Sequence, residues 1–400
     1  MNKLHTPRAI QERGLTLIEL LVAVTIGLVV TLAVTSAVIF GESTKRTTTS
    51  VNDMSQSGSY AAYVLDRAVR SAGSGFAQSW DLGVFGCKPQ VKKGATTILP
   101  RTTAFPAPFE KFLGGAAGSA NLRVAPVVIG KGQSPDGVSD VLMVMSGNGA
   151  AGDVPRPIIA AGASANILRL DNTVQLNKND LTLISQVGAD CLLEQVDSTF
   201  VDSASNELLP LGGTNAYYTA GSGTTLAALA ASGSAYLTLL GNDTAKNVQF
   251  QLFGVSNDRT LFSYDLLRSN GTDTPQALAD GVMEMHAIYG VDSNKDGILD
   301  AWAAPDSADY GVAAKMAVAG TTAAEIAEST RKIVAVRVGL LLRSSTLERD
   351  EVTLKIPAMF SGTGVARAEV NLPAGDARRY RYRVVELTIP LRNLLLLPSS

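Results

Sequence analysis

The chain has 400 residues, a formal net charge of −2 and 46% hydrophobic residues. A slightly acidic chain offers no general surface for nucleic acid, so no nucleic-acid partner is predicted. The hydrophobic fraction is ordinary for a globular protein, and the length leaves room for one large domain or two small ones. No glycine pattern of a nucleotide-binding loop is found, which argues against that class of enzyme.

A short basic leader precedes a long uncharged run at the N-terminus. Lys3, Arg8 and Arg13 stand before Gly14, and no charge occurs from residue 20 to residue 40. That run has the ~20 residues that a helix needs to cross a membrane. A secretory signal peptide has a shorter apolar region, and its cleavage site lies behind that region. The positive-inside rule places the leader in the cytoplasm and the residues after 40 outside.

Glu19 directly precedes this uncharged run, at a position where an ionisable side chain is costly and usually functional. The residues Gly14-Leu15-Thr16-Leu17-Ile18-Glu19 resemble the type IV prepilin leader. The resemblance implies that a prepilin peptidase cuts between Gly14 and Leu15 and methylates the new amine. It also implies that Glu19, the fifth mature residue, pairs with the amine of a neighbouring subunit during filament assembly. A plain membrane anchor is the alternative, but it does not explain this motif.

The first helix is expected to continue beyond the membrane. After the leader at 1–14, residues 15–40 form the transmembrane or filament-core helix, and residues 41–73 continue it along a globular head. The continuation has a stripe of small and apolar residues at steps of three and four, which is typical of a packed helix face. The stripe consists of Met54, Gly58, Ala61, Leu65, Ala68, Val69 and Ala72. Gly73 to Gly75 end the helix, and Thr47 to Thr49 favour a kink or break between its halves.

Residues 74–400 are expected to form a β-rich head outside the membrane. Short segments rich in β-branched and apolar residues alternate with turn residues, which predicts an α+β fold with an antiparallel sheet beside the helix. The predicted strands begin at Val138, Asn166, Asn247, Thr260, Met283, Ile333 and Val384. Two stretches, 113–121 and an insertion at 202–245 rich in Gly, Ser, Thr and Ala, are expected to be loops.

Cys87 and Cys191 are the two cysteines, and both follow the predicted span. In an oxidising compartment they are expected to pair, although two buried free thiols are the alternative. A disulfide between them closes a loop of about 100 residues and contributes up to about 4–5 kcal/mol in the chain-entropy model.

The two histidines argue against catalysis. His5 lies in the leader, and His286 lies in the middle of a predicted strand, where Met283, Met285, Ala287 and Tyr289 are expected on the opposite face. His286 is therefore expected to be a surface histidine or one bonded within the strand. The solitary cysteines supply no zinc site, and the chain is predicted not to be an enzyme.

One segment matches the opening of a calcium loop. Asp292, Asn294 and Asp296 are followed by Gly297, the backbone carbonyl of Ile298 and then Asp300. Alternate oxygen ligands on a tight turn suit Ca²⁺, and the expected role is structural. The twelfth position is Ala303 and not Glu, so an EF-hand domain is not expected. A polar hairpin turn is the alternative reading, because Asp-Gly is a strong turn signal.

Segments along the whole chain are similar to the PilW family of minor pilins, although the insertion at 202–245 departs from it. The resemblance implies a low-abundance pilin that initiates pilus assembly at the tip. Its partners are expected to be other minor pilins, the major pilin and a large tip adhesin. The chain would wait in the inner membrane and then be extracted into the filament. The segments begin at Leu65, Gly86, Val138, Leu278, Tyr289, Val336 and Pro390.

Two other functions share parts of this pattern. A minor pseudopilin of type II secretion has the same leader and the same acid at position 19. A membrane-anchored calcium-binding adhesin would need neither cleavage nor Glu19.

A basic cluster lies near the C-terminus and consists of Arg378, Arg379, Arg381 and Arg383, with two tyrosines between them. The cluster allows polyanion binding, but a solvated strand face is favoured.

Overall fold

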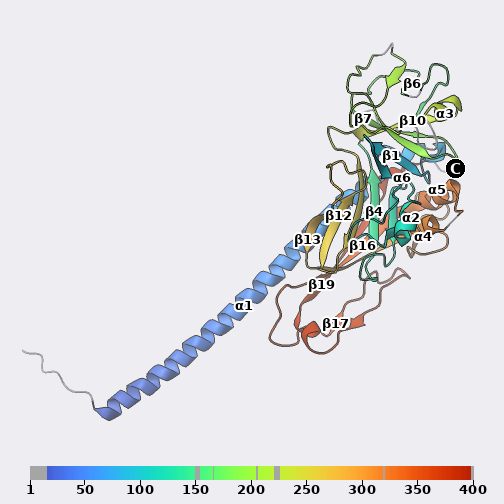
Figure 1. The fold of residues 1–400 in the computed structure, drawn as a ribbon. Coiled ribbons are helices and arrows are strands. Elements are labelled where there is room, and N and C mark those ends of the chain that lie inside the picture. Colours follow the sequence, from blue (N-terminus) through green and yellow to red (C-terminus); the bar gives the residue numbers. More distant parts are fainter. Residues whose placement is uncertain are drawn as a thin grey trace, which may run out of the picture. The chain divides into compact units, whose positions relative to one another are not determined.

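The computed structural model describes residues 16–148, 154–164, 166–203, 206–219, 226–318 and 320–397. The chain divides into two compact units, Met1–Asn52 and Asp53–Ser400. Helix α1 (Leu17–Ser71) begins in the first unit and ends in the second, and the remaining elements all belong to the second (Figure 1). The predicted α+β fold, a long N-terminal helix with antiparallel sheets, is confirmed.

Helix α1 is continuous, so the break expected near Thr47 does not occur. A run of i to i−4 hydrogen bonds overrides the weak helix propensity of threonine, and the Thr44 and Thr48 hydroxyls also bond back to the preceding turn. The predicted stripe is buried in the second unit from Met54 to Ala72. Gly73 ends the helix with a positive φ of 78°, as expected.

A five-stranded antiparallel sheet has the order β13-β12-β11-β4-β3. Its outer strand β3 and the neighbouring strand β4 are buried along their whole length. The strands are β3 (Val127–Gly130), β4 (Val141–Ser146), β11 (Gln249–Val255), β12 (Thr260–Asp265) and β13 (Gln276–Asp280).

A four-stranded antiparallel sheet has the order β15-β14-β16-β19. The strands are β14 (Val282–Val291), β15 (Ala301–Ala303), β16 (Ile333–Arg343) and β19 (Tyr382–Pro390). The register of β14 against β16 shifts between Val282 and Glu284. Because of this bulge, Met283 does not share a face with Met285, Ala287 and Tyr289, although the alternation in the sequence predicts that it does. Met283 packs with Ile288 on the outer face, whereas Met285, Ala287 and Tyr289 are buried as predicted.

The third of the larger sheets has six strands in the order β2-β1-β8-β7-β10-β5. One pair in it, β1 with β8, is parallel, and the other neighbours are antiparallel. The strands are β1 (Pro89–Lys93), β2 (Thr96–Leu99), β5 (Arg156–Pro157), β7 (Asp180–Ser185), β8 (Cys191–Gln195) and β10 (Tyr236–Asn242).

Short elements connect and cover these sheets. Two small antiparallel pairs are β6 (Ile167–Arg169) with β9 (Leu208–Pro210), and β17 (Lys355–Ile356) with β18 (Val370–Asn371). The short helices are η1 (Ala77–Leu82), η2 (Phe112–Gly114), α2 (Ala116–Ser119), α3 (Leu226–Ala231), α4 (Val312–Ala317), α5 (Ala323–Arg331), η3 (Asp376–Arg379) and α6 (Arg392–Leu395).

The two stretches expected to be loops contain regular structure. Residues 113–121 form short helical turns, and the stretch 202–245 contributes β9, α3 and β10. β10 pairs with β7 on one side and β5 on the other, so it is an interior strand of its sheet. Its apolar residues Leu237, Leu239 and Leu240 are buried, and this burial outweighs the loop-like composition around them.

Candidate functional site

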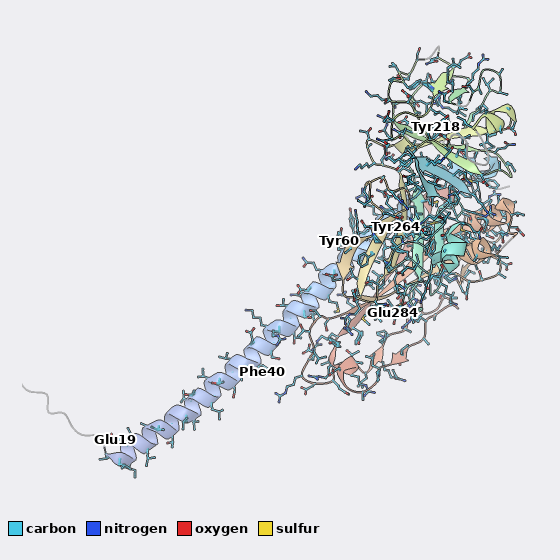
Figure 2. The ribbon with its side chains drawn as sticks, in the orientation of Figure 1. Glu19, Phe40, Tyr60, Tyr218, Tyr264 and Glu284 are labelled. Atoms are coloured by element: carbon cyan, nitrogen blue, oxygen red, sulfur yellow. A yellow bond between two sulfur atoms is a disulfide. The ribbon has the colours of Figure 1, made fainter. Side chains whose placement is uncertain are left out.

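The apolar part of α1 carries the candidate assembly site. Glu19 lies in the first turn of the helix, where its backbone N–H donates to the Thr16 hydroxyl at 3.3 Å. Figure 2 shows Glu19 near one end of α1 and Phe40 further along the same helix. Gly14 and Leu15, the predicted cleavage site, lie outside the described residues.

The side chains between Leu17 and Phe40 form an apolar surface on the first unit. All residues from Leu17 to Phe40 are exposed, and α1 is long and apolar enough to cross a membrane. The threonine hydroxyls on it are bonded within the helix; Thr31, for example, donates to the Gly27 carbonyl at 2.7 Å. Hydroxyls bonded in this way are tolerated in an apolar surrounding, which leaves Glu19 as the ionisable group of the segment.

Cys87 and Cys191 form a disulfide, as predicted. Cys191 opens strand β8 and is paired in register with Pro89 of β1. The disulfide therefore lies beside the parallel strand pair and connects segments 104 residues apart in the sequence. Both cysteines are buried.

The predicted calcium loop is closed by its own hydrogen bonds. Asp292 is buried, and its carboxylate accepts the backbone N–H groups of Lys295 at 2.6 Å and Gly297 at 2.6 Å. The Asp296 carboxylate accepts the N–H of Ile298, and the Asn294 amide donates to it. The Asp300 carboxylate accepts from the backbone and the hydroxyl of Ser293.

Within the described ranges, no group of three or more His, Cys, Asp or Glu side chains is placed to hold a metal ion. The loop also has oxygens that this grouping does not include, those of Asn294 and the Ile298 carbonyl. Lys295 pairs with Glu328 of α5 at 2.9 Å and ties the loop to that helix. Calcium binding by this loop stays a prediction.

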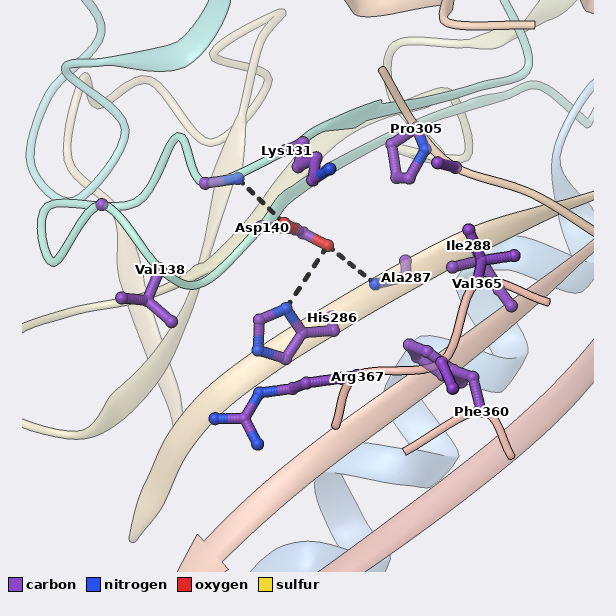
Figure 3. A pocket seen from close by; sticks show the side chains of 14 residues that line it. Lys131, Val138, Asp140, His286, Ala287, Ile288, Pro305, Phe360, Val365 and Arg367 are labelled. Carbon is purple, nitrogen blue, oxygen red and sulfur yellow. Dashed lines mark hydrogen bonds and ion pairs between the residues drawn. The ribbon is translucent and has the colours of Figure 1, made fainter. Parts of the chain in front are cut away.

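His286 is bonded within and across its strand, which agrees with the sequence-based expectation. Its ring lies 3.0 Å from the Glu284 carboxylate. It lies 3.7 Å from the carboxylate of Asp140, as Figure 3 marks with a dashed line. Burial alone would lower the pKa of His286. The hydrogen bonds and charges of Asp140 and Glu284 outweigh burial and raise this pKa to about 9. His286 is therefore a cation at neutral pH.

Two further residues of this cluster were not predicted. Asp140 accepts the backbone N–H groups of Gly132 and Ala287, each at 2.9 Å, and so joins the β3–β4 loop to β14. Arg367, from the segment between β17 and β18, pairs with Glu284 at 2.6 Å. The sequence could not reveal these partners, because they come from three segments far apart in the chain.

A cavity of about 610 Å³ adjoins this cluster. Figure 3 shows Val138, Pro305, Phe360 and Val365 around it, together with His286 and Arg367. Within the cluster two cations and two carboxylates offset each other, and Lys131, which also lines the cavity, pairs with Asp306. We interpret the cluster as a structural connection that holds the 360–367 segment against β14.

The arginine cluster near the C-terminus is occupied by acidic partners. Arg378 pairs with Glu351, Arg379 with Asp376, and Arg381 with Glu348. Arg383 donates to the Ser55 hydroxyl of α1 at 3.0 Å. The expected strand face is found only in part, because Arg378 and Arg379 lie in η3 and Arg381 precedes β19. The contacts leave little uncompensated charge for a polyanion.

Two family models match the chain. Residues 11–35 match the prokaryotic N-terminal methylation motif, and residues 248–393 match type IV pilus-assembly protein W. The second match runs from just before β11 to α6, so it includes the whole four-stranded sheet; residues 36–247 are matched by neither model. No curated protein and no solved structure matches the chain.

The two matches and the fold agree with one another. The methylation motif covers the start of the apolar helix that carries Glu19, and the second match covers the sheet that packs beside the end of that helix. This family is structural rather than catalytic. Over residues 248–393 the chain is of the type IV pilus-assembly protein W family, PilW, and at residues 11–35 it carries the N-terminal methylation motif.

Proposed function

We propose that this chain is a minor pilin that helps to initiate type IV pilus assembly within a tip-proximal complex of minor pilins. The observation that carries the proposal is the apolar part of α1, with Glu19 in its first turn, in a chain whose C-terminal part is of the PilW family. Such a helix packs against lipid before assembly and against neighbouring pilin helices afterwards.

The proposed processing follows from the same segment. Prepilin peptidase removes residues 1–14, and Leu15 becomes a methylated N-terminus. The chain waits in the inner membrane with its head in the periplasm and then enters the surface pilus. There its partners are other minor pilins and the major pilin, with a large tip adhesin as a further partner. The Glu19 carboxylate neutralises the amine of a neighbouring subunit, because two opposite charges in an apolar surrounding lower their cost by pairing.

The test compares Glu19→Ala with Glu42→Ala, which removes the next acid along the same helix. We expect both variants to be cleaved after Gly14, as intact mass and N-terminal sequencing would show. Glu19→Ala should reduce pili per cell and its own amount in sheared pili at least tenfold, whereas Glu42→Ala should change neither.

Three outcomes would contradict the proposal. A chain that keeps residues 1–14 in cells with the peptidase is not a pilin. Normal piliation with Glu19→Ala would remove the role of the carboxylate. Loss of secreted enzymes with normal pili would assign the chain to type II secretion.

Calcium binding is tested separately by thermal unfolding in EDTA, in Mg²⁺ and in Ca²⁺. We expect Ca²⁺ to raise the midpoint of the native chain and to have less effect on Asp296→Asn. That variant removes a charge but keeps the oxygen that accepts from Ile298. Equal midpoints in EDTA and Ca²⁺ would leave the loop a hydrogen-bonded turn.

A further inference from the structure

A groove lies between α1 and strand β13 in the second unit. Its volume is about 530 Å³, and it is lined by Asp53, Gln56 and Tyr60 of the helix and by Leu278 and Asp280 of the strand, among others. β13 ends its five-stranded sheet, and β12 is its neighbour in that sheet (Figure 1). One edge of β13 therefore has backbone N–H and C=O groups available for another strand.

The edge of β13 lacks the basic residue and the proline found on a comparable edge, although its pairing with β12 is bulged between Leu261 and Phe262. β19 ends the four-stranded sheet, but it carries Arg383 and finishes at Pro390, and such residues discourage strand addition. β13 has the sequence Gln-Ala-Leu-Ala-Asp, with no basic residue and no proline inside it. Ala277 is exposed in the middle of the strand, so no large side chain covers its backbone there.

The groove is also acidic. Asp53 and Asp280 both line it, and the groove residues include no lysine or arginine. The Asp280 carboxylate is held by the Thr260 hydroxyl at 2.9 Å. Tyr60, half exposed on α1, supplies an aromatic wall, which Figure 2 shows on the helix. The carboxylates favour a cationic side chain, and the tyrosine ring also attracts cations.

We propose that this groove receives an extended segment of a neighbouring pilus subunit, which adds a strand to β13 and brings a lysine or arginine to Asp53 and Asp280. In strand addition, main-chain hydrogen bonds supply affinity and the side-chain sites supply specificity. The proposal rests on the proposed function, because it requires the chain to stand in a pilus. The groove lies on the same helix that carries Glu19, so one helix would offer both contacts.

The test uses a photo-cross-linking benzoylphenylalanine at position 277 of the full chain in piliated cells. The matched control carries it at exposed position 258, in the turn between β11 and β12. We expect position 277 to cross-link to a pilin segment that contains lysine or arginine, and position 258 not to do so. Adding Asp53→Asn and Asp280→Asn should lower the yield at least fivefold, whereas Asp258→Asn should not change it.

Asparagine keeps an acceptor for Thr260, and an unchanged unfolding midpoint would show that the double variant is folded. A chain that is present in sheared pili but does not cross-link from 277 would overturn the inference and leave the proposed function standing. So would a cross-link to a second copy or to a protein that is not a pilin, or a yield that the asparagines leave unchanged. A chain absent from pili despite an intact Glu19 would overturn the proposed function, and the inference with it.

Discussion

Single side chains set how this molecule responds to pH, and Glu194 is the strongest case. It lies on the interior strand β8 with no exposed surface, and it accepts hydrogen bonds from the backbone and hydroxyl of Thr219. Burial raises the pKa of Glu194 to about 7, although the bonds from Thr219 oppose this. The folded state therefore holds this proton more tightly than the unfolded chain does.

We predict that Glu194→Gln stabilises the protein at alkaline pH. The native chain loses stability as the pH rises from the unfolded pKa near 4.5 to the folded pKa near 7, by about 3 kcal/mol at 1.36 kcal/mol per pKa unit. Glutamine avoids that loss, so the variant should exceed the native chain at pH 8 and match it near pH 4.5. Urea unfolding at both values measures this. Glu110→Gln, which changes an exposed acid, is the control. If Glu194→Gln raised the free energy of unfolding equally at both pH values, the argument would be contradicted.

His286 has the opposite sign. Its folded pKa of about 9 lies above the ordinary value of 6.5, so its contribution to stability is complete below pH 6.5 and disappears as the pH rises through 9. We predict that His286→Gln costs about 3 kcal/mol near pH 6 and much less at pH 10. Chemical unfolding across this range is the measurement. A cost that stays constant with pH would show that packing, and not the charge shared with Asp140 and Glu284, is what the histidine supplies.

At the scale of elements, the contact of α1 with β16 depends on one missing side chain. A Cβ atom built on Gly58 would lie 2.1 Å from Cδ1 of the buried Leu342. Glycine is a weak helix former, so its place inside a 55-residue helix is explained by close approach and not by propensity.

We predict that Gly58→Val destabilises the second unit by about 1–3 kcal/mol through overpacking. Ser59→Val is the matched control, because it places the same side chain one residue along on an exposed position. It should cost only the small helix propensity of valine. Urea unfolding of both variants decides, and equal costs would show that Leu342 moves aside freely.

At the scale of the whole molecule, the disulfide connects distant parts of the chain. We predict that Cys87→Ser with Cys191→Ser lowers the free energy of unfolding by up to about 4–5 kcal/mol, because the bond closes a loop of about 100 residues. A reducing agent should lower the stability of the native chain towards that of the double variant and leave the variant unchanged. A native chain that unfolds identically with and without reductant would refute this.

The sequence predicts those features of the whole fold that are encoded locally. The stripe from Met54 to Ala72 and the apolar run at Ile333–Arg343 were both recognised, since helix and strand periodicity lie within one segment. β10 was missed because glycine, serine and alanine around it resemble a loop, while its burial depends on β7 and β5.

The candidate site likewise contains some residues that the sequence predicts and others that it does not. The place of Glu19 in the first turn of an apolar helix could be predicted, because the acid and the apolar run lie within one segment of the sequence. The Asp140–His286–Glu284–Arg367 cluster could not, because its members meet only after two sheets and a covering segment have come together. The bulge that turns Met283 outward likewise depends on the register with β16.

Residues of the C-terminal strands and of α6 contact the second half of α1. The Asn393 amide donates to the Ala72 carbonyl at 2.9 Å, and Arg383 and Leu342 meet the same helix at Ser55 and Gly58. In a chain exported with its N-terminal helix in the membrane, that helix emerges first and its covering strands emerge last. The contacts that Leu342, Arg383 and Asn393 make with the helix can therefore form only late in translocation. A chain stalled before they form exposes part of its core to the chaperones and proteases of the envelope.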